Sequence, residues 1–313
     1  MTAVSPHIPV LYQEALEGLA LRGGGRYIDA TLGGGGHAEG MLAGSSPAGL
    51  LLGVDLDPEA VAIARTRLAQ FGDRARLVEG DFRDLSRIAA DQGFDPCDGV
   101  LLDLGMSSAQ LVQSDRGFSY REAGPLDMRF SPRLETTASD LVNQLAEPEL
   151  AKIFHRYGEE PKARAIARAV VRQRPVETTD RLARIVAGVL GRRRRHPARR
   201  VFQALRIAVN DELGALEAVL PQAVSLLRAG GRLAVIAFHS LEDRIVKRFM
   251  KREAQDCICE PDLPVCICRH RASVRILTRR PVRAGPDEVA QNPRARSGRL
   301  RVAARLPDPT SVA

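Results

Sequence analysis

Residues 26–57 read RYIDATLGGGGHAEGMLAGSSPAGLLLGVDLD, and this stretch decides the fold. An apolar-alternating run, Tyr27–Leu32, stops at four consecutive glycines, Gly33–Gly36, and a helix-compatible segment follows. A second apolar run, Leu50–Val54, ends in Asp55. The order of strand, glycine turn, helix, strand and acid is typical of a nucleotide-binding unit. Glycines let a ligand approach the backbone, and the acid can accept hydrogen bonds from ribose hydroxyls.

The glycine pattern alone leaves the ligand undecided. Gly33, Gly35 and Ala38 fit the G-x-G-x-x-A pattern of dinucleotide sites, and Asp55 follows at roughly the 20-residue spacing of such sites. The same elements would suit S-adenosylmethionine, and a tight strand–helix turn without a ligand would also contain them. We predict a nucleotide-bearing cofactor, and the downstream sequence must choose between a nicotinamide dinucleotide and S-adenosylmethionine.

Composition limits the classes of protein that fit. The chain has 313 residues and a net charge of +8, and 44% of its residues are hydrophobic. These values indicate a globular protein with an anionic partner such as nucleic acid. The N-terminal residues lack the basic and apolar regions of a signal peptide, and the apolar runs have strand length. We therefore expect a cytoplasmic protein without a membrane partner, in which the five cysteines are not a disulfide framework.

Strands and helices alternate through the first third of the chain. A helix is predicted over 58–71, with Pro58 in its first turn. Ala75–Phe82 predicts a third strand, and the nearly apolar Asp98–Gly105 predicts a fourth strand covered on both faces. In a doubly wound sheet the ligand lies at the carboxyl ends of the strands. The ligand-type residues at these ends are Gly33–Gly36, Asp55, Asp81, Phe82 and Asp103.

The alternation stops after the fourth strand. Ser108–Val209 shows helical periodicity and no convincing strand. Strand-type alternation returns at Gly230–Met250, as a fifth strand and its helix. Ser273–Thr278 and Arg299–Leu306 predict two further strands. We therefore predict an α/β fold, a doubly wound Rossmann-like sheet interrupted by an inserted all-helical domain.

Several phrases of the sequence together resemble one family, from His7 to about Arg305. The chain is similar to the RsmH family, also called MraW, of 16S ribosomal RNA cytosine-N4 methyltransferases. The phrases that carry the resemblance, in the order of the family, are HIPVLYQEAL, DATLGGGGHAEG, GVDLDP, DLGMSS, DRGFSY, GPLDMR, GEEPKARAIARA, HPARRVFQALRIAVN, AFHSLEDRIVKRF and NPRARS.

The resemblance implies a reaction and a domain organisation. The reaction is transfer of a methyl group from S-adenosylmethionine to the exocyclic N4 of one cytidine, in 16S ribosomal RNA or the small subunit. The implied organisation is a seven-strand methyltransferase domain over 1–108 and 210–313, and an inserted RNA-recognition domain over 109–209. The cofactor contacts that carry over by residue are Gly35, Gly36, His37, Asp55, Phe82, Asp103 and Gln110.

The chemistry of the residues agrees with this resemblance. Asp81 and Asp103 would repel a pyrophosphate, which disfavours the nicotinamide oxidoreductase. Methylation at carbon 5 of cytosine needs a cysteine nucleophile, but Cys97 precedes the fourth strand, at the wrong end of the sheet, and is predicted to be a packing residue. We therefore predict direct in-line transfer to nitrogen, without a covalent enzyme intermediate. A third hypothesis, a basic RNA-binding or ribosome-assembly factor without activity, stays open.

The catalytic predictions centre on the tip of the fourth strand. Asp103 is the first choice to orient the amine and accept its proton. Ser107 and the neighbouring Ser108 are weaker candidates, and His239, at the tip of the fifth strand, either faces the base or is a satisfied structural histidine. The ring that stacks on the base is open. The aromatic candidates are Phe118 and Tyr120, which otherwise anchor their loop.

Two basic stretches are candidate contacts to RNA phosphates. Gly191–Arg200 reads GRRRRHPARR and contains no acid, and Asn292–Arg301 reads NPRARSGRLR. Such clusters suit the phosphate backbone of an RNA, although each could also be a solvated face. His7, in the entry loop, either lies near the ligand or belongs to a docking segment. Whether the chain forms a homodimer is open.

Four late cysteines form C-x-C-x6-C-x-C: Cys257, Cys259, Cys266 and Cys268. Four thiolates can form a tetrahedral zinc site, but C-x-C is a less usual spacing than C-x-x-C. Free thiols or a conditional disulfide are the alternatives, and the sequence does not decide between them. The cluster is remote from the other motifs, so we assign it no catalytic role, and we assign no metal to the active site.

Overall fold

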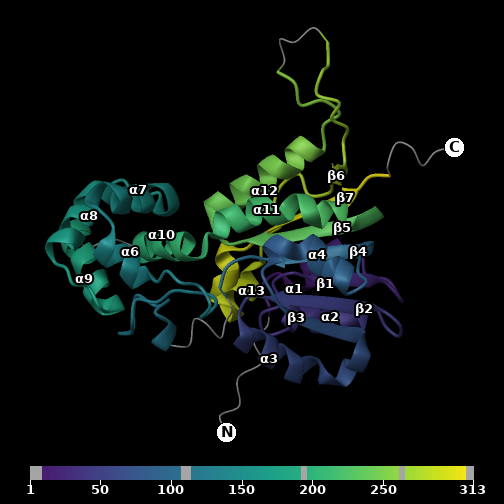
Figure 1. Ribbon diagram of the computed structural model, residues 1–313. Helices are drawn as coiled ribbons and strands as arrows, with labels where there is room; N and C mark the ends of the chain where they lie inside the picture. Colours follow the sequence, from purple (N-terminus) through teal and green to yellow (C-terminus); the bar gives the residue numbers. More distant parts are fainter. Residues whose placement is uncertain (1–8, 107–113, 192–195, 261–264, 308–313) are drawn as a thin grey trace. The chain divides into compact units, whose positions relative to one another are not determined.

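The computed structural model in Figure 1 describes residues 9–106, 114–191, 196–260 and 265–307. The chain divides into two compact units. The first unit contains Met1–Gly105 and Leu213–Ala313, and the second contains Met106–Glu212. The second unit is thus inserted between two segments of the first.

The first unit is a seven-stranded sheet with the order β3-β2-β1-β4-β5-β7-β6. The first five strands along the chain pair in parallel, and β7 runs antiparallel between β5 and β6. The strands are β1 (Arg26–Asp29), β2 (Leu50–Asp55), β3 (Ala75–Glu79), β4 (Cys97–Asp103), β5 (Leu227–Ala237), β6 (Val274–Ile276) and β7 (Arg299–Arg305). The strand order reverses between β1 and β4, and ligands of open α/β sheets bind outside the carboxyl ends of the strands at such a point.

Both faces of this sheet are covered by helices. Successive residues of a strand point to opposite faces, so each strand contributes side chains to two separate buried clusters. On β2, Leu52 and Val54 belong to one buried cluster, whereas Leu51 belongs to the other. The first cluster includes residues of α4 (Leu85–Asp91), α11 (Glu212–Ser225) and α12 (Ser240–Glu253). The second cluster includes residues of α1 (Tyr12–Leu19), α2 (Gly36–Gly44) and α3 (Pro58–Leu68). A short helix, α13 (Pro286–Gln291), precedes β7.

The predicted fold class is confirmed, and the strand bounds differ only at their ends. The third strand stops at Glu79, before the predicted end at Phe82, because Phe82 begins a 3-10 turn, Phe82–Asp84. Asp57 accepts a hydrogen bond from Glu59 N at 3.1 Å, so it caps α3, whose first residue is Pro58.

The second unit has a hydrophobic core of its own. Its helices are α6 (Ala138–Gln144), α7 (Glu147–Gly158), α8 (Ala163–Arg172), α9 (Thr179–Leu190) and α10 (Arg199–Asn210). Buried side chains from all five helices form one cluster. Among the residues that the structure describes here, β-pairing is limited to one isolated bridge, Pro125–Thr178.

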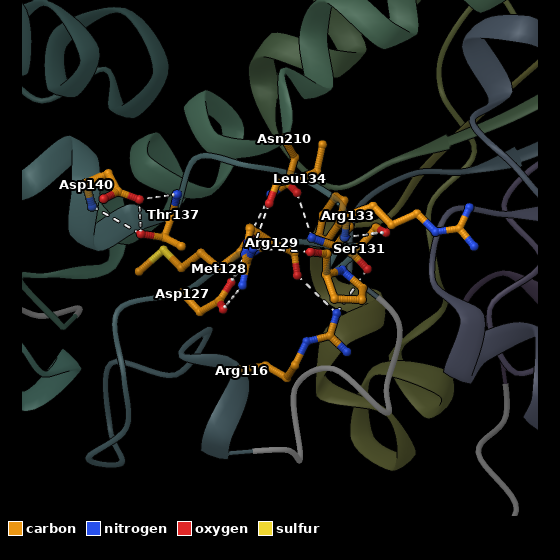
Figure 2. Close-up of polar contacts among 12 residues, drawn as sticks. Arg116, Asp127, Met128, Arg129, Ser131, Arg133, Leu134, Thr137, Asp140 and Asn210 are labelled. Atoms are coloured by element: carbon orange, nitrogen blue, oxygen red, sulfur yellow. Dashed lines mark hydrogen bonds and ion pairs between the residues drawn. The ribbon is translucent and has the colours of Figure 1, made fainter.

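A polar network holds an irregular loop of the second unit, and Figure 2 shows its residues. Asn210, the last residue of α10, donates to the carbonyl of Met128 at 2.8 Å and accepts from the backbone N–H of Phe130 at 2.7 Å. Arg129 forms two side-chain hydrogen bonds of 2.8 Å with Asp127. Burial acts to raise the pKa of Asp127, but the hydrogen bonds from Arg129 outweigh it and hold that pKa below its usual range. The residues of the phrase GPLDMR therefore form an irregular loop, which side-chain hydrogen bonds hold in place instead of the backbone hydrogen bonds of a helix or sheet.

Within the described segments, no helix has both the length and the apolar character that a membrane crossing requires.

Candidate cofactor and active site

The glycine turn joins β1 to α2 at the carboxyl edge of the sheet. Gly33 and Gly35 have positive φ values of 49° and 77°, a conformation that side chains with a Cβ rarely adopt. Gly35 is the N-cap of α2, so the first helical residues are Gly36 and His37. The predicted contacts Gly35, Gly36 and His37 therefore lie at a helix N-terminus, where backbone N–H groups favour an anion such as a carboxylate.

Asp55, at the end of β2, receives two backbone hydrogen bonds. Gly33 N donates to Oδ2 at 2.7 Å, and Asp57 N donates to Oδ1 at 2.9 Å. Burial raises the pKa of Asp55 to about 6, although these hydrogen bonds oppose the rise. Each carboxylate oxygen can accept a further hydrogen bond. Asp55 is therefore fixed in place by the glycine turn and keeps acceptor capacity for hydroxyl groups.

Asp103 lies at the end of β4, and one of its two carboxylate oxygens has no hydrogen-bond donor among the described residues. His37 Nδ1 lies 3.5 Å from Asp103 Oδ2, and the His37 ring stacks on Tyr12 with ring centroids 6.0 Å apart. Asp103 Oδ1 is shielded from solvent, and no group in the described part of the chain donates a hydrogen bond to it. Because an unsatisfied buried oxygen is costly, this atom is suited to a donor supplied by a ligand.

Two residues that the sequence analysis did not single out connect the strand ends. Thr31 N donates to Asp29 Oδ1 at 3.2 Å, and Thr31 Oγ1 accepts from Asp103 N at 2.6 Å. Asp29 is 1% exposed, and burial raises its pKa to about 7. The signal that could have found Asp29 is its place as the last residue of its strand, like Asp55 and Asp103 in theirs.

The acids at this edge oppose one another's ionisation. Burial raises the pKa of Asp103 well above its usual range, and the charges of Asp29 and Glu242 act in the same direction. The pKa of Asp29 is itself raised further by the charge of Asp55. Because a positive charge would relieve this repulsion, the carboxyl ends of β1, β2 and β4 favour a cationic ligand over a pyrophosphate.

Phe82 lies half-buried just after β3, and its ring packs against the sheet core. The neighbouring Asp81 is engaged locally, because its Oδ1 accepts from Arg83 N at 2.9 Å and its Oδ2 lies 3.2 Å from Arg83 Nη1. The structure thus gives Asp81 the role of capping the turn that positions Phe82.

His239 caps helix α12. Its Nδ1 accepts from Glu242 N at 3.3 Å, its Nε2 lies 3.0 Å from Glu242 Oε1, and its side chain is 9% exposed. Nδ1 thus accepts a hydrogen bond in the helix cap, whereas Nε2 lies beside the Glu242 carboxylate, is shielded from solvent and has no hydrogen-bond partner among the described residues. Both alternatives, a structural histidine and a group that faces the base, therefore stay. A catalytic role for His239 stays a prediction.

The structure places the other predicted residues as follows. Cys97 is 1% exposed at the start of β4, and burial raises the pKa of its thiol to about 12, so its prediction as a packing residue is confirmed. Ser107, Ser108, Gln110 and His7 lie outside the described residues.

Both aromatic candidates of the second unit have partners in that unit. Phe118 is buried, and its ring stacks on Phe130 with centroids 5.8 Å apart. Tyr120 stacks on His196 at 4.5 Å and meets Phe202 edge-on at 5.8 Å. These contacts favour the alternative that the two rings anchor their loop.

The two basic stretches differ in their partners. Arg199 and Arg200 are exposed, and Arg200 Nη1 lies 3.6 Å from the buried Glu160, whereas residues 192–195 lie outside the described part. In the second stretch, Arg299 and Arg301 pair with Asp243 of α12 at 3.2 and 2.7 Å, and Arg301 is buried. Part of Asn292–Arg301 is therefore structural and is not available for RNA phosphates.

The topology and site together define a class of protein. A Rossmann-like sheet with β7 inserted antiparallel next to β5, and with acids and a glycine turn at its switch point, is the arrangement of the methyltransferase fold. The sequence then specifies the group within this class. The family model of the MraW methylase family matches residues 4–306, and the chain belongs to this family. The resemblance noted in the sequence is thereby confirmed.

Curated relatives match over nearly their whole length. The ribosomal RNA small subunit methyltransferase H of Thermomicrobium roseum is 57% identical over 305 residues, which cover 96% of this chain and 94% of the relative. The protein of the same name from Geobacter sulfurreducens is 53% identical, with 96% of this chain and 99% of the relative covered. Among solved structures, a putative rRNA methylase from Clostridium thermocellum overlaps 97% of this chain and 100% of its own chain, with 12% identity and a TM-score of 0.46.

Proposed function

We propose that this protein transfers the methyl group of S-adenosylmethionine to the exocyclic N4 of a cytidine in 16S ribosomal RNA of the small subunit. The observation that carries the proposal is the shielded Asp103 Oδ1 at the end of β4, which has no hydrogen-bond donor among the described residues. The family is one of methylases, and the relatives named above are ribosomal RNA small subunit methyltransferases.

The residues present fit S-adenosylmethionine. Gly35, Gly36 and His37 at the start of α2 would hold its carboxylate, Asp55 its ribose hydroxyls, and the Phe82 ring its adenine. The acids at the ends of β1 and β4 suit its ammonium and sulfonium charges. When bound, the cofactor supplies an electrophilic methyl group on sulfur. Gln110, which belongs to the same predicted set, would complete the cofactor contacts.

The target amine is a poor nucleophile because its lone pair is delocalised into the cytosine ring. Asp103, when ionised, would accept a hydrogen bond from this amine, favour its pyramidal form and take its proton as the nitrogen–carbon bond forms and the carbon–sulfur bond breaks. Ser107 and His239 are further candidates for orienting the base. We expect direct in-line transfer without a covalent enzyme intermediate. The position of Cys97, buried at the amino end of β4, supports this because its thiol is not placed to act as a nucleophile at the other end of the strand.

The experiment that tests this function is methyl transfer from labelled S-adenosylmethionine to small subunits from cells that lack the protein, followed by nucleoside analysis. We expect the label in one N4-methylated cytidine. Label at carbon 5 or on a ribose would contradict the acceptor, and binding of the cofactor without transfer to subunits or to naked 16S RNA would favour the assembly factor without activity.

The arginines of the first basic stretch should carry part of the affinity for RNA. Replacing Arg192–Arg195 and Arg199 with alanine should weaken binding to RNA. The slope of the logarithm of the RNA-binding constant against the logarithm of the salt concentration should also decrease in magnitude, by about 0.7–0.9 for each phosphate that the variant no longer neutralises. Arg200 is left in place because it pairs with the buried Glu160. Binding is measured over a series of salt concentrations, with the exposed Arg65→Ala of α3 as the control. An unchanged slope would exclude the stretch from the interface.

A further inference from the structure

The cysteine segment, residues 254–260 and 265–273 after α12, brings four thiols together far from the cofactor residues in sequence. Cys266 Sγ lies 3.4 Å from Cys257 Sγ, 3.6 Å from Cys268 Sγ and 4.0 Å from Cys259 Sγ, and Cys257 and Cys268 are 3.8 Å apart. All four sulfur atoms lie within 4.8 Å of one another. The four cysteines come from two short segments, Cys257–Cys259 and Cys266–Cys268, each of which contributes a pair.

We infer that Cys257, Cys259, Cys266 and Cys268 form a structural zinc site. A zinc–sulfur bond of about 2.3 Å places the sulfurs of a tetrahedral site about 3.8 Å apart. Four of the six sulfur pairs here are 3.4–4.0 Å apart, close to this separation. A disulfide instead requires about 2.05 Å, and the four thiols are free in the structure. With four protein ligands the site is closed, so its role is structural and not catalytic.

The surroundings of Cys268 suit a metal-bound thiolate. The backbone N–H groups of Ile258 and His270 donate to Cys268 Sγ at 3.4 and 3.5 Å. Four thiolates on one zinc ion leave a net charge of −2, and Arg269 and Arg271 follow directly in the sequence. Hydrogen bonds of this kind are the outer contacts that orient and stabilise metal ligands.

Among the residues that the structure describes, the cysteine segment has few other contacts that could order it. Its apolar side chains point to solvent, with Ile258, Val265 and Ile267 exposed by 37%, 69% and 72%. At its base, Ala272 N donates to Asp256 Oδ1 at 3.3 Å, and the His270 ring lies 3.1 Å from the carbonyl of Arg252 in α12. None of the three buried apolar clusters of the described chain includes Ile258, Val265 or Ile267, so metal binding would supply the free energy that orders the segment.

The test is metal analysis of the full chain, purified under reducing conditions without chelator and dialysed against zinc. We expect about one zinc ion per chain, and replacement by Co²⁺ should give the intense visible absorption of a tetrahedral cobalt–thiolate centre. Cys257→Ser and Cys268→Ser should each reduce bound zinc to near zero. Two controls should keep the full amount, Cys97→Ala in the sheet core and Ile267→Ser between two of the cysteines.

Proteolysis gives a second measurement that does not depend on methyl transfer. Removal of zinc by a chelator should make residues 254–273 the first site of cleavage, and added zinc should restore protection. The inference would be overturned by wild-type protein that binds no zinc, by an intact mass lacking two hydrogens for each disulfide, or by serine variants that retain zinc.

Discussion

Replacing Asp103 with asparagine should lower the rate of methyl transfer by about 10²- to 10⁴-fold. Asparagine keeps the shape of the side chain but cannot accept a proton from the cytidine amine. Because the pKa of Asp103 is raised well above its usual range, the wild-type rate should increase with pH as this carboxyl group ionises. The variant should lose both the rate and this pH dependence.

Single-turnover transfer with saturating cofactor measures this effect, and equilibrium dialysis of the cofactor measures binding separately. Asp91→Asn, an exposed acid at the end of α4 that pairs with Arg87, is the matched control and should leave both quantities unchanged. A variant that binds the cofactor weakly but transfers at the wild-type rate when saturated would make Asp103 a binding residue only.

Asp29→Asn should stabilise the protein without cofactor at pH 8, and by a clearly smaller amount at pH 5. Burial raises the pKa of Asp29 to about 7, so between about pH 4 and 7 the folded protein holds a proton that the unfolded chain has released. The free energy of unfolding therefore falls as pH rises through this range, by up to about 4 kcal/mol for this group. Asparagine has no charge to desolvate and still accepts the hydrogen bond from Thr31 N.

Calorimetry at the two pH values measures this difference, since 1 kcal/mol corresponds to roughly 2–4 °C in Tm for a protein of this size class. The variant should melt well above the wild type at pH 8, and at pH 5 the difference in Tm should be only about a third as large. If the difference in Tm between the variant and the wild type were the same at both pH values, Asp29 would be ionised at both. The same variant should bind S-adenosylmethionine more weakly, because one of the acids that favour its positive charges is removed.

The sheet, and the residues at the carboxyl ends of its parallel strands, could be predicted from the sequence because both depend on local patterns. Alternating apolar residues predict strands, and the last residues of parallel strands meet at one edge, so Asp55 and Asp103 could be placed without coordinates. The glycine turn was equally visible, because Gly33 and Gly35 adopt the positive φ values that its glycines suggest.

The remaining features depend on contacts between distant residues, which no local pattern contains. Thr31 receives the backbone hydrogen bond of Asp103, 72 positions later, and Arg301 pairs with Asp243, 58 positions earlier. From the sequence alone, a basic stretch therefore resembles a phosphate-binding surface. Only the fold shows that an acid distant in sequence, here Asp243, pairs with its arginines. His239 is similar, because a histidine at a strand tip and a histidine that caps a helix have the same sequence context.

The position of β7 has a consequence for how the chain folds during synthesis. The second unit is continuous, so it can form its core while translation is still in progress. The sheet cannot be completed then, because β5 pairs with β4 across the whole insertion and β7, the last strand to be made, is an interior strand. Until β7 leaves the ribosome, the nascent protein presents β5 as an open edge, which is the kind of surface that invites aggregation or chaperone binding.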